Sequence, residues 1–368
     1  MNKTLTDNIN KIRPRKVILP VFLGLGIVGW FIYRDFHKIE FSDFDFSYYS
    51  LLFIGFAVLM MVLRDVGYIV RLRILSSNEL SWLKCLRIIL LWEFGSAITP
   101  SAVGGTAIAT LFIWKEGLSL GKSTSIVVAT SFLDELYFSL MFPLIFIVFS
   151  RAELFHVVGS SAIANQFLIF ALIGYGVKLF WTILMGYSIF INPKFIASII
   201  TGIFKLKFLK KWKALANKMT INFEISNREL KTKNFKFWLK AFFTSFISWT
   251  SRYWVLNFLL IALYYSLKYD MYVQFLSMHD HFLIFAKQLV MWIMMLIMPT
   301  PGGSGFVETI FNSYMVEFVP VTGFVIIMAL VWRMLTYYPY LFIGVFLAPA
   351  WVNKNFKKIK LKKRTPKK

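Results

Sequence analysis

The sequence predicts an all-α, polytopic integral membrane protein with about six full spans and two re-entrant helical hairpins of opposite orientation. Hydrophobic residues make up 58% of the 368 residues and charged residues only 16%, whereas a soluble domain carries about a quarter charged residues. Apolar stretches of roughly 20 residues recur along the chain, and each could cross a bilayer. Two hydrophobic segments are interrupted by Thr-Pro followed by Gly-Gly. We therefore expect a single membrane domain over residues 1–368.

The full spans follow from the apolar stretches and from the charged residues that flank them. The first has no small-residue cleavage site after it, so it is predicted to be retained rather than removed as a signal peptide. The second is followed by Arg64, Arg71, Arg73 and Lys84, which are expected to mark the cytoplasmic face. The full spans are expected at residues 17–33, 47–63, 126–149, 163–191, 241–267 and 321–351.

The formal net charge of +23 is concentrated in loops, which argues against a nucleic-acid partner. The central loop alone has twelve Lys or Arg and only two Glu. Because cytoplasmic loops carry excess Lys and Arg, we expect a multi-pass protein of the cell inner (cytoplasmic) membrane with both termini in the cytoplasm. The central loop is either a solvated connector or an amphipathic helix lying on the membrane surface. The basic segments are residues 1–16, 192–240 and 352–368.

Two pairs of shorter apolar segments, residues 82–114 and 282–318, are predicted to form hairpins that enter from opposite sides. Proline removes a backbone donor and glycine weakens a helix, so a break at membrane depth must line an enclosed or hydrated cavity. Oppositely inserted broken helices indicate an inverted repeat and a transport site. Each hairpin could instead be two complete helices. The residues at the predicted breaks are Thr99, Pro100, Gly104, Gly105, Thr300, Pro301, Gly302, Gly303 and Gly305.

Ionisable residues inside apolar segments are candidates for function, because a charge at membrane depth costs several kcal/mol unless it is paired or hydrated. Asp134 lies 34 residues after Pro100 and Arg333 lies 32 residues after Pro301, a second correspondence between the two halves. Arg87 and Lys178 are closer to span ends and are expected to extend toward the interface. The candidates for headgroup binding are Glu93, Asp134, Arg252, Glu308 and Arg333.

Each of these candidates also has a structural interpretation. Glu308 is expected in the first turn of a helix that begins near Gly305, where it could cap the helix or bind a cationic headgroup. Arg252 and Arg333 could form internal salt bridges with Asp134, Glu135 or Glu308. Their guanidinium groups could instead bind phosphate bidentately.

The chain offers few other signs of chemistry. The single Cys85 excludes an intramolecular disulfide and a cysteine metal cluster. The His-Asp-His triplet at 279–281 has no third ligand in view and is interpreted as a surface turn. We find no Ser-His-Asp order, phosphate-binding Walker loop or HExxH motif, so no cofactor, metal or catalytic residue is expected.

The interrupted segments resemble those of the lysylphosphatidylglycerol synthase transmembrane-region family, also called flippase-like. The resemblance rests on TPSAVGGTAIATLFIWKEGLSLGKS, on SFLDELYF, and on PTPGGSGFVET with Arg333 downstream. It implies a membrane domain with re-entrant helices that is associated with moving lipids between leaflets. The soluble aminoacyl-transferase domain of the full-length enzymes is not expected after the lysine-rich tail. Many relatives have a glutamate and a basic residue where this chain has Thr106 and Ala109, which moves the expected headgroup contacts to the second hairpin.

Together these features predict a protein that binds or translocates a lipid headgroup, with membrane lipids as partners. An anionic phospholipid or a polyprenyl phosphate would fit the basic candidates. The rival hypothesis is a membrane-embedded enzyme, or enzyme subunit, that acts on a polyprenyl-phosphate- or glycolipid-linked substrate through Asp134 and Glu135. A third hypothesis is a scaffold whose basic loop and tail recruit partners.

Overall fold

Five long helices in the computed structural model are apolar and long enough to cross a membrane, among the residues that it describes. They correspond to the second through sixth predicted spans, and the predicted first span lies outside the described residues. The all-helical membrane fold is therefore confirmed for this part of the chain. The described residues are 45, 47–98, 102–157, 161–192, 194–195, 198, 202, 227–267, 276–295, 306–321 and 324–362.

Polar caps fix where several of the spans begin. The Ser47 side chain accepts a hydrogen bond from the N–H of Ser50, and Ser119 and Asn234 cap α6 and α11 in the same way. Such caps satisfy backbone donors that a helix leaves free at its start. The spans are α3 (Tyr48–Leu75), α6 (Leu120–Val148), α8 (Ser161–Gly186, continued by a π-helical turn, Tyr187–Ile191), α11 (Phe235–Ser266), and α14 (Phe324–Thr336) with α15 (Tyr338–Lys362).

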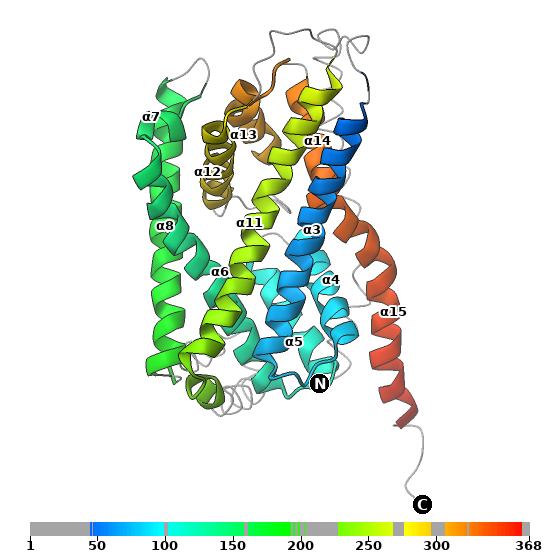
Figure 1. The fold of residues 1–368 in the computed structure, drawn as a ribbon. Helices are drawn as coiled ribbons and strands as arrows, with labels where there is room; N and C mark the ends of the chain where they lie inside the picture. Colours follow the sequence, from blue (N-terminus) through cyan, green and yellow to red (C-terminus); the bar gives the residue numbers. More distant parts are fainter. Residues whose placement is uncertain are drawn as a thin grey trace, which may run out of the picture.

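Helices α3 and α11 lie side by side at the centre of the bundle (Figure 1). Their close approach requires Gly67, because a Cβ at this position would lie 2.2 Å from Ser248 Oγ and 2.9 Å from the carbonyl oxygen of Thr244. These two oxygen atoms leave no room for a methyl group at residue 67, since packed interiors have few voids. The two central spans are therefore closely packed, and other helices of the bundle contact them.

Two pairs of shorter helices enter the bundle from opposite ends (Figure 1). Helix α4 (Trp82–Ile98) and helix α5 (Ala102–Lys115) form the first hairpin, in the lower half of the view. Helix α12 (Met278–Met295) and helix α13 (Phe306–Met315), followed by the 3₁₀ turn Val316–Phe318, form the second hairpin in the upper half. This arrangement agrees with the opposite orientations that the charge pattern predicts.

Several predicted boundaries are wrong. Helix α3 continues to Leu75, so Arg64 and Arg71 lie within a span and do not mark its end. Residues 235–240 belong to α11 rather than to the basic loop, and residues 352–362 belong to α15 rather than to the tail. The last predicted span is divided at Tyr337 into α14 and α15.

Gly104 and Gly105 were predicted to lie in the first break, but both belong to α5. A Cβ on Gly105 would lie 2.1 Å from Ser96 Oγ and 3.1 Å from Ser96 Cα, so this glycine lets α4 and α5 pack closely. The other predicted break residues lie outside the described residues: Thr99, Pro100, Thr300, Pro301, Gly302, Gly303 and Gly305.

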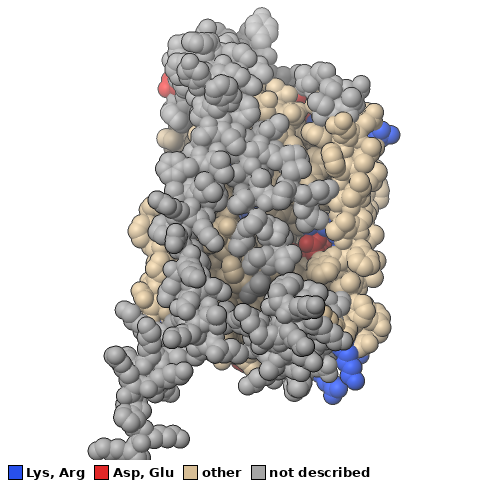
Figure 2. All heavy atoms as spheres, turned by 180° about the vertical axis from the view of Figure 1, so that it is seen from behind, with Lys and Arg blue, Asp and Glu red and all other residues tan. Residues whose placement is uncertain are grey.

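The described surface of the bundle is largely apolar at mid-height. In Figure 2 it is tan there except for one small group of acidic and basic atoms. Helix α8 illustrates the cause, because Phe180 and Ile183 are 65% and 62% exposed. A row of large exposed apolar side chains suits contact with lipid tails rather than with water.

Candidate functional site

The polar centre of the bundle begins on one face of α3. Arg64, Tyr68 and Arg71 are spaced by four and three residues, so their side chains lie on the same side of the helix. The two guanidinium carbons lie 4.7 and 4.8 Å from the centroid of the Tyr68 ring. Arg64 and Arg71 are only 1% and 4% exposed, so both cations are buried within a membrane span.

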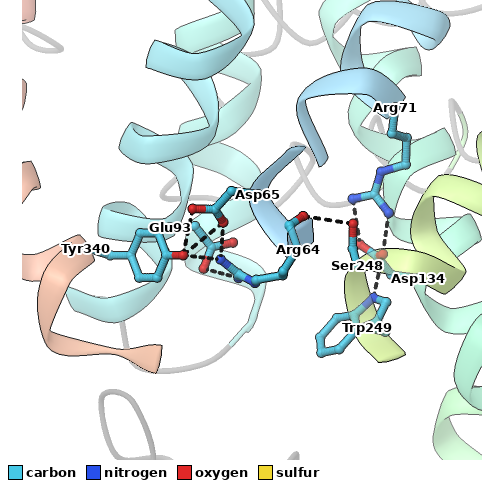
Figure 3. A network of polar contacts seen from close by, with 8 residues as sticks. All are labelled: Arg64, Asp65, Arg71, Glu93, Asp134, Ser248, Trp249 and Tyr340. Carbon is cyan, nitrogen blue, oxygen red and sulfur yellow. Dashed lines mark hydrogen bonds and ion pairs between the residues drawn. The ribbon is translucent and has the colours of Figure 1, made fainter. Parts of the chain in front are cut away.

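Arg64 is neutralised by carboxylates from two helices. Its Nη2 lies 2.6 Å from Glu93 Oε2 on α4, and its Nη1 lies 2.8 Å from Asp65 Oδ1. Arg64 Nη1 also donates to the Tyr340 hydroxyl of α15 at 2.8 Å, and that hydroxyl donates to Asp65 at 2.8 Å (Figure 3). This group therefore joins α3 to the first hairpin and to the last span.

Arg71 is neutralised by Asp134 of α6, which it contacts through both of its terminal nitrogens. Arg71 also donates to Ser245 Oγ of α11 at 2.7 Å. Trp249 Nε1 donates to Asp134 Oδ1 at 2.7 Å (Figure 3). Bidentate pairs between arginine and a carboxylate are among the stronger hydrogen-bonded contacts in proteins. This second group joins α3, α6 and α11.

A hydrogen bond from α11 to α3 connects the two groups into one network. The Ser248 hydroxyl of α11 donates to the carbonyl oxygen of Arg64 at 2.9 Å, one turn of α11 away from Ser245 (Figure 3). We call these eight residues the α3 network: Arg64, Asp65, Arg71, Glu93, Asp134, Ser248, Trp249 and Tyr340. Breaking a buried ion pair costs about 3–5 kcal/mol, so the network also stabilises the bundle.

The charges of the α3 network are not equally buried. The side chains of Asp65, Glu93 and Asp134 are 24%, 22% and 21% exposed, whereas both arginines are almost fully covered. The accessible edge of the network is therefore made of carboxylates. A polar edge of this kind among apolar spans suits water or a polar headgroup and does not suit lipid tails.

A third ion pair lies next to the network. Lys178 Nζ of α8 donates to Glu135 Oε2 of α6 at 2.7 Å, and the ammonium group lies 4.3 Å from the centroid of the Phe138 ring. Lys178 is 4% exposed, so the expectation that it extends toward the interface is wrong. It neutralises a carboxylate inside the bundle instead.

The structure brings together two of the five candidate residues, Glu93 and Asp134. Arg252 lies beside this group, over the rings of Trp249 and Trp292. Arg333 is 3% exposed and lies over Tyr337, near the end of α14. Glu308 is in the first turn of α13, as predicted, but its side chain lies outside the described residues.

The predicted salt-bridge partners of Asp134 and Glu135 are wrong. The main cations of the site, Arg64 and Arg71, were not among the predicted site residues. Asp134 and Glu135 pair with Arg71 and Lys178, not with Arg252 or Arg333. Arg64 and Arg71 were assigned to the cytoplasmic face because they follow an apolar stretch. Their seven-residue spacing, with an aromatic ring between them, is the signal that could have placed them on one buried helix face.

Comparison with known proteins is consistent with this membrane architecture. The chain is 27% identical over 300 residues to a "UPF0104 membrane protein" of Archaeoglobus fulgidus. The aligned region covers 78% of this chain and 83% of the relative. No solved structure matches the chain. The model of the lysylphosphatidylglycerol synthase TM region family matches residues 17–344, and the chain therefore belongs to that family.

Proposed function

We propose that this protein binds a lipid headgroup at mid-depth of the bundle and moves it between the two leaflets. The observation that carries the proposal is the α3 network, a set of charges with an accessible carboxylate edge inside an apolar bundle. The network connects the first hairpin to the central spans through Glu93 and Arg64. The headgroup would pass along this edge while its acyl chains stay in the surrounding lipid.

The opposite entry of the two hairpins supports this mechanism. Each hairpin would close one side of the path, so that the polar edge faces one leaflet at a time. We place the first hairpin on the cytoplasmic side, because Lys122, Lys231 and Lys233 lie at the end of the bundle where α6 and α11 begin. Labelling of cysteines introduced at residues 99–106 and 300–308 should then occur from opposite sides of the membrane. Labelling of both segments from one side would contradict the inverted arrangement.

The direct test is leaflet exchange in liposomes that contain the purified full chain. Fluorescent zwitterionic, anionic and polyprenyl lipids would be added, and exchange would be compared with protein-free liposomes. Glu93→Gln removes one charge from the accessible edge and should slow exchange by about tenfold, equivalent to ~1.4 kcal/mol. If the wild-type chain does not accelerate the leaflet exchange of any of these lipids, the proposal is wrong.

Glu79→Gln is the matched control for this experiment. Glu79 also pairs with a cation, since Lys122 Nζ lies 2.6 Å from its carboxylate, but its side chain is 50% exposed at the end of the bundle. The same carboxyl-to-amide change should leave exchange at the wild-type rate. Equal losses in the two variants would indicate a general effect of charge rather than a path along the α3 network.

A further inference from the structure

Arg252 differs from Arg64 and Arg71 in having no carboxylate partner among the described residues. It lies near the middle of α11, and no acidic side chain among the described residues comes within 4.0 Å of it. Arg64, by contrast, contacts both Asp65 and Glu93. Among the described residues, two carboxylates therefore contact Arg64 and none contacts Arg252.

Two tryptophans hold the Arg252 side chain. Its guanidinium carbon lies 5.1 Å from the ring centroid of Trp292 on α12 and 5.9 Å from that of Trp249 on α11. Trp249 is 7% exposed, whereas Arg252 and Trp292 are half-buried. A cation gains less from an aromatic face than it loses by leaving water, so these rings position the charge without neutralising it.

The position of Arg252 connects it to the α3 network. The indole that lies beside the guanidinium is the same one whose Nε1 donates to Asp134 Oδ1 at 2.7 Å. Arg252 also lies one turn of α11 after Ser248, which donates to the Arg64 carbonyl oxygen. Arg252 is therefore adjacent to the polar edge and faces the first helix of the second hairpin.

We propose that Arg252, held by Trp249 and Trp292, is the binding site for the phosphate group of a lipid headgroup. A guanidinium presents a planar set of donors that matches two phosphate oxygens, and phosphate is the common anion of membrane lipid headgroups. Binding would bring an anion into contact with a guanidinium that touches no carboxylate of the described residues. This inference rests on the proposed function, since it names the chemistry of the headgroup that the site receives.

Binding can be measured with the full chain in nanodiscs of a neutral galactolipid, by the change in tryptophan fluorescence. The probes are short-chain phosphatidylglycerol, the matching diacylglycerol without phosphate, and inorganic phosphate. The wild-type chain should bind the phospholipid and not the diacylglycerol. Arg252→Gln should weaken phospholipid binding by at least about tenfold, equivalent to ~1.4 kcal/mol.

Two further variants make the result specific. Arg252→Lys keeps the charge but loses the bidentate geometry, so its affinity should lie between those of the wild type and Arg252→Gln. It also serves as the test if Arg252→Gln does not fold. Arg73→Gln is the control, because Arg73 likewise lies over a tryptophan, 4.7 Å from the Trp82 ring, but at the end of α3. It should bind like the wild type.

The outcomes separate this inference from the proposed function. Unchanged affinity in both Arg252 variants, or equal binding of the diacylglycerol, would overturn it. Inorganic phosphate that displaces the phospholipid with equal affinity would assign the site to a soluble phosphate and overturn the lipid as its source. Binding that depends on Arg252 without any leaflet exchange would overturn only the proposed function.

Discussion

In both hairpins an ion pair joins the first helix to the residues that follow the second helix, and we call this region the base of the hairpin. The same arrangement of charges is made by different residues in the two bases. Glu116 and Glu317 each lie sixteen residues after the proline of their own break, just beyond the second helix of the hairpin. Glu116 pairs with Arg87 of α4 at 3.0 Å, and Glu317 pairs with Lys287 of α12. A carboxylate after the second helix thus holds a cation of the first helix in both hairpins.

Each carboxylate also binds a ring nitrogen from a neighbouring element. Trp351 Nε1 of α15 donates to Glu116 at 2.9 Å, and His156 Nδ1, just after α7 (Arg151–Leu154), lies 2.7 Å from Glu317. The correspondence supports an inverted repeat more directly than the Thr-Pro and Gly-Gly pattern, because it joins residues in space. It also shows that Arg87 is paired within the hairpin, although it was expected to extend toward the interface.

The difference between the two bases lies in burial and in titration. Arg87 is 30% exposed and its carboxylate partner 7%, whereas Lys287 is fully buried and its partner is 24% exposed. An indole does not titrate, but an imidazole changes its charge between about pH 5 and 8. The ring that binds the carboxylate therefore differs between the two bases: an indole in the first hairpin and an imidazole in the second.

The largest expected effect is an unequal loss of stability when each carboxylate is replaced. Glu317→Gln leaves the buried Lys287 ammonium without a counter-charge and should lower the free energy of unfolding by about 3 kcal/mol. Glu116→Gln leaves Arg87, which water can reach, and should lower it by about 1 kcal/mol. Thermal unfolding of the two variants in the same detergent measures the difference.

A double variant checks the cause of that difference. If the unpaired ammonium is responsible, Lys287→Met should restore most of the stability lost in Glu317→Gln. Equal losses in Glu317→Gln and Glu116→Gln, with no recovery in the double variant, would show that burial of the cation does not distinguish the two bases.

Much of this fold could be predicted from the sequence because hydropathy and basic loops act locally. They located five described spans and the two pairs of shorter helices that lie at opposite ends of the bundle. They failed at Arg64 and Arg71, because an arginine after an apolar stretch looks the same whether it faces water or a buried carboxylate. Pro339, the second residue of α15, was an unused signal for the division at Tyr337, since proline favours the first turn of a helix.

The site could be predicted less completely, because its pairs join residues far apart in the chain. Glu93 and Asp134 were identified as charges at membrane depth, and both belong to the α3 network. Which cation each would meet depends on how α3 and α11 pack, and that packing is set by Gly67 against Ser248. No spacing along the sequence encodes the contact between Asp134 and Arg71.

A smaller effect is expected from the ring nitrogen of the first hairpin base. Trp351→Phe removes the N–H that reaches Glu116 and keeps a ring against Phe112, whose centroid is 4.9 Å from that of Trp351. The free energy of unfolding should fall by about 1 kcal/mol, the usual contribution of one hydrogen bond. Chemical denaturation of the variant and the wild type measures this loss. A loss that changes between pH 5.5 and 8 would contradict the assignment of this hydrogen bond to a donor that does not titrate.

The smallest expected effect is a pH dependence confined to the second hairpin. Two bridges join the segment around α7 to this hairpin: His156 with Glu317, and His279 Nε2 with Glu153 Oε1 at 3.1 Å. Hydrogen bonds from the side chain and the backbone N–H of Ser150 lower the pKa of Glu153. A carboxyl group with a lowered pKa contributes stability above its unfolded-state pKa and loses it only as the pH falls through the folded-state value.

Glu153 therefore stays ionised from pH 8 to 5.5, the range in which an ordinary imidazole, with a pKa near 6.5, gains its proton. The other described charged groups near the bridges are Lys287, which contacts Glu317, and Asp280, whose carboxylate lies 4.0 Å from His279. Because a charged imidazole attracts a carboxylate more strongly than a neutral one, the base of the second hairpin should tighten modestly as the pH falls to 5.5. Hydrogen exchange of residues 306–318, corrected for the intrinsic effect of pH, should then slow, while residues 102–115 should not change. The double variant His156→Gln with His279→Gln should remove this response. A response of equal size in both hairpins would mean that the two bases do not differ in titration, and that the imidazoles are not its source.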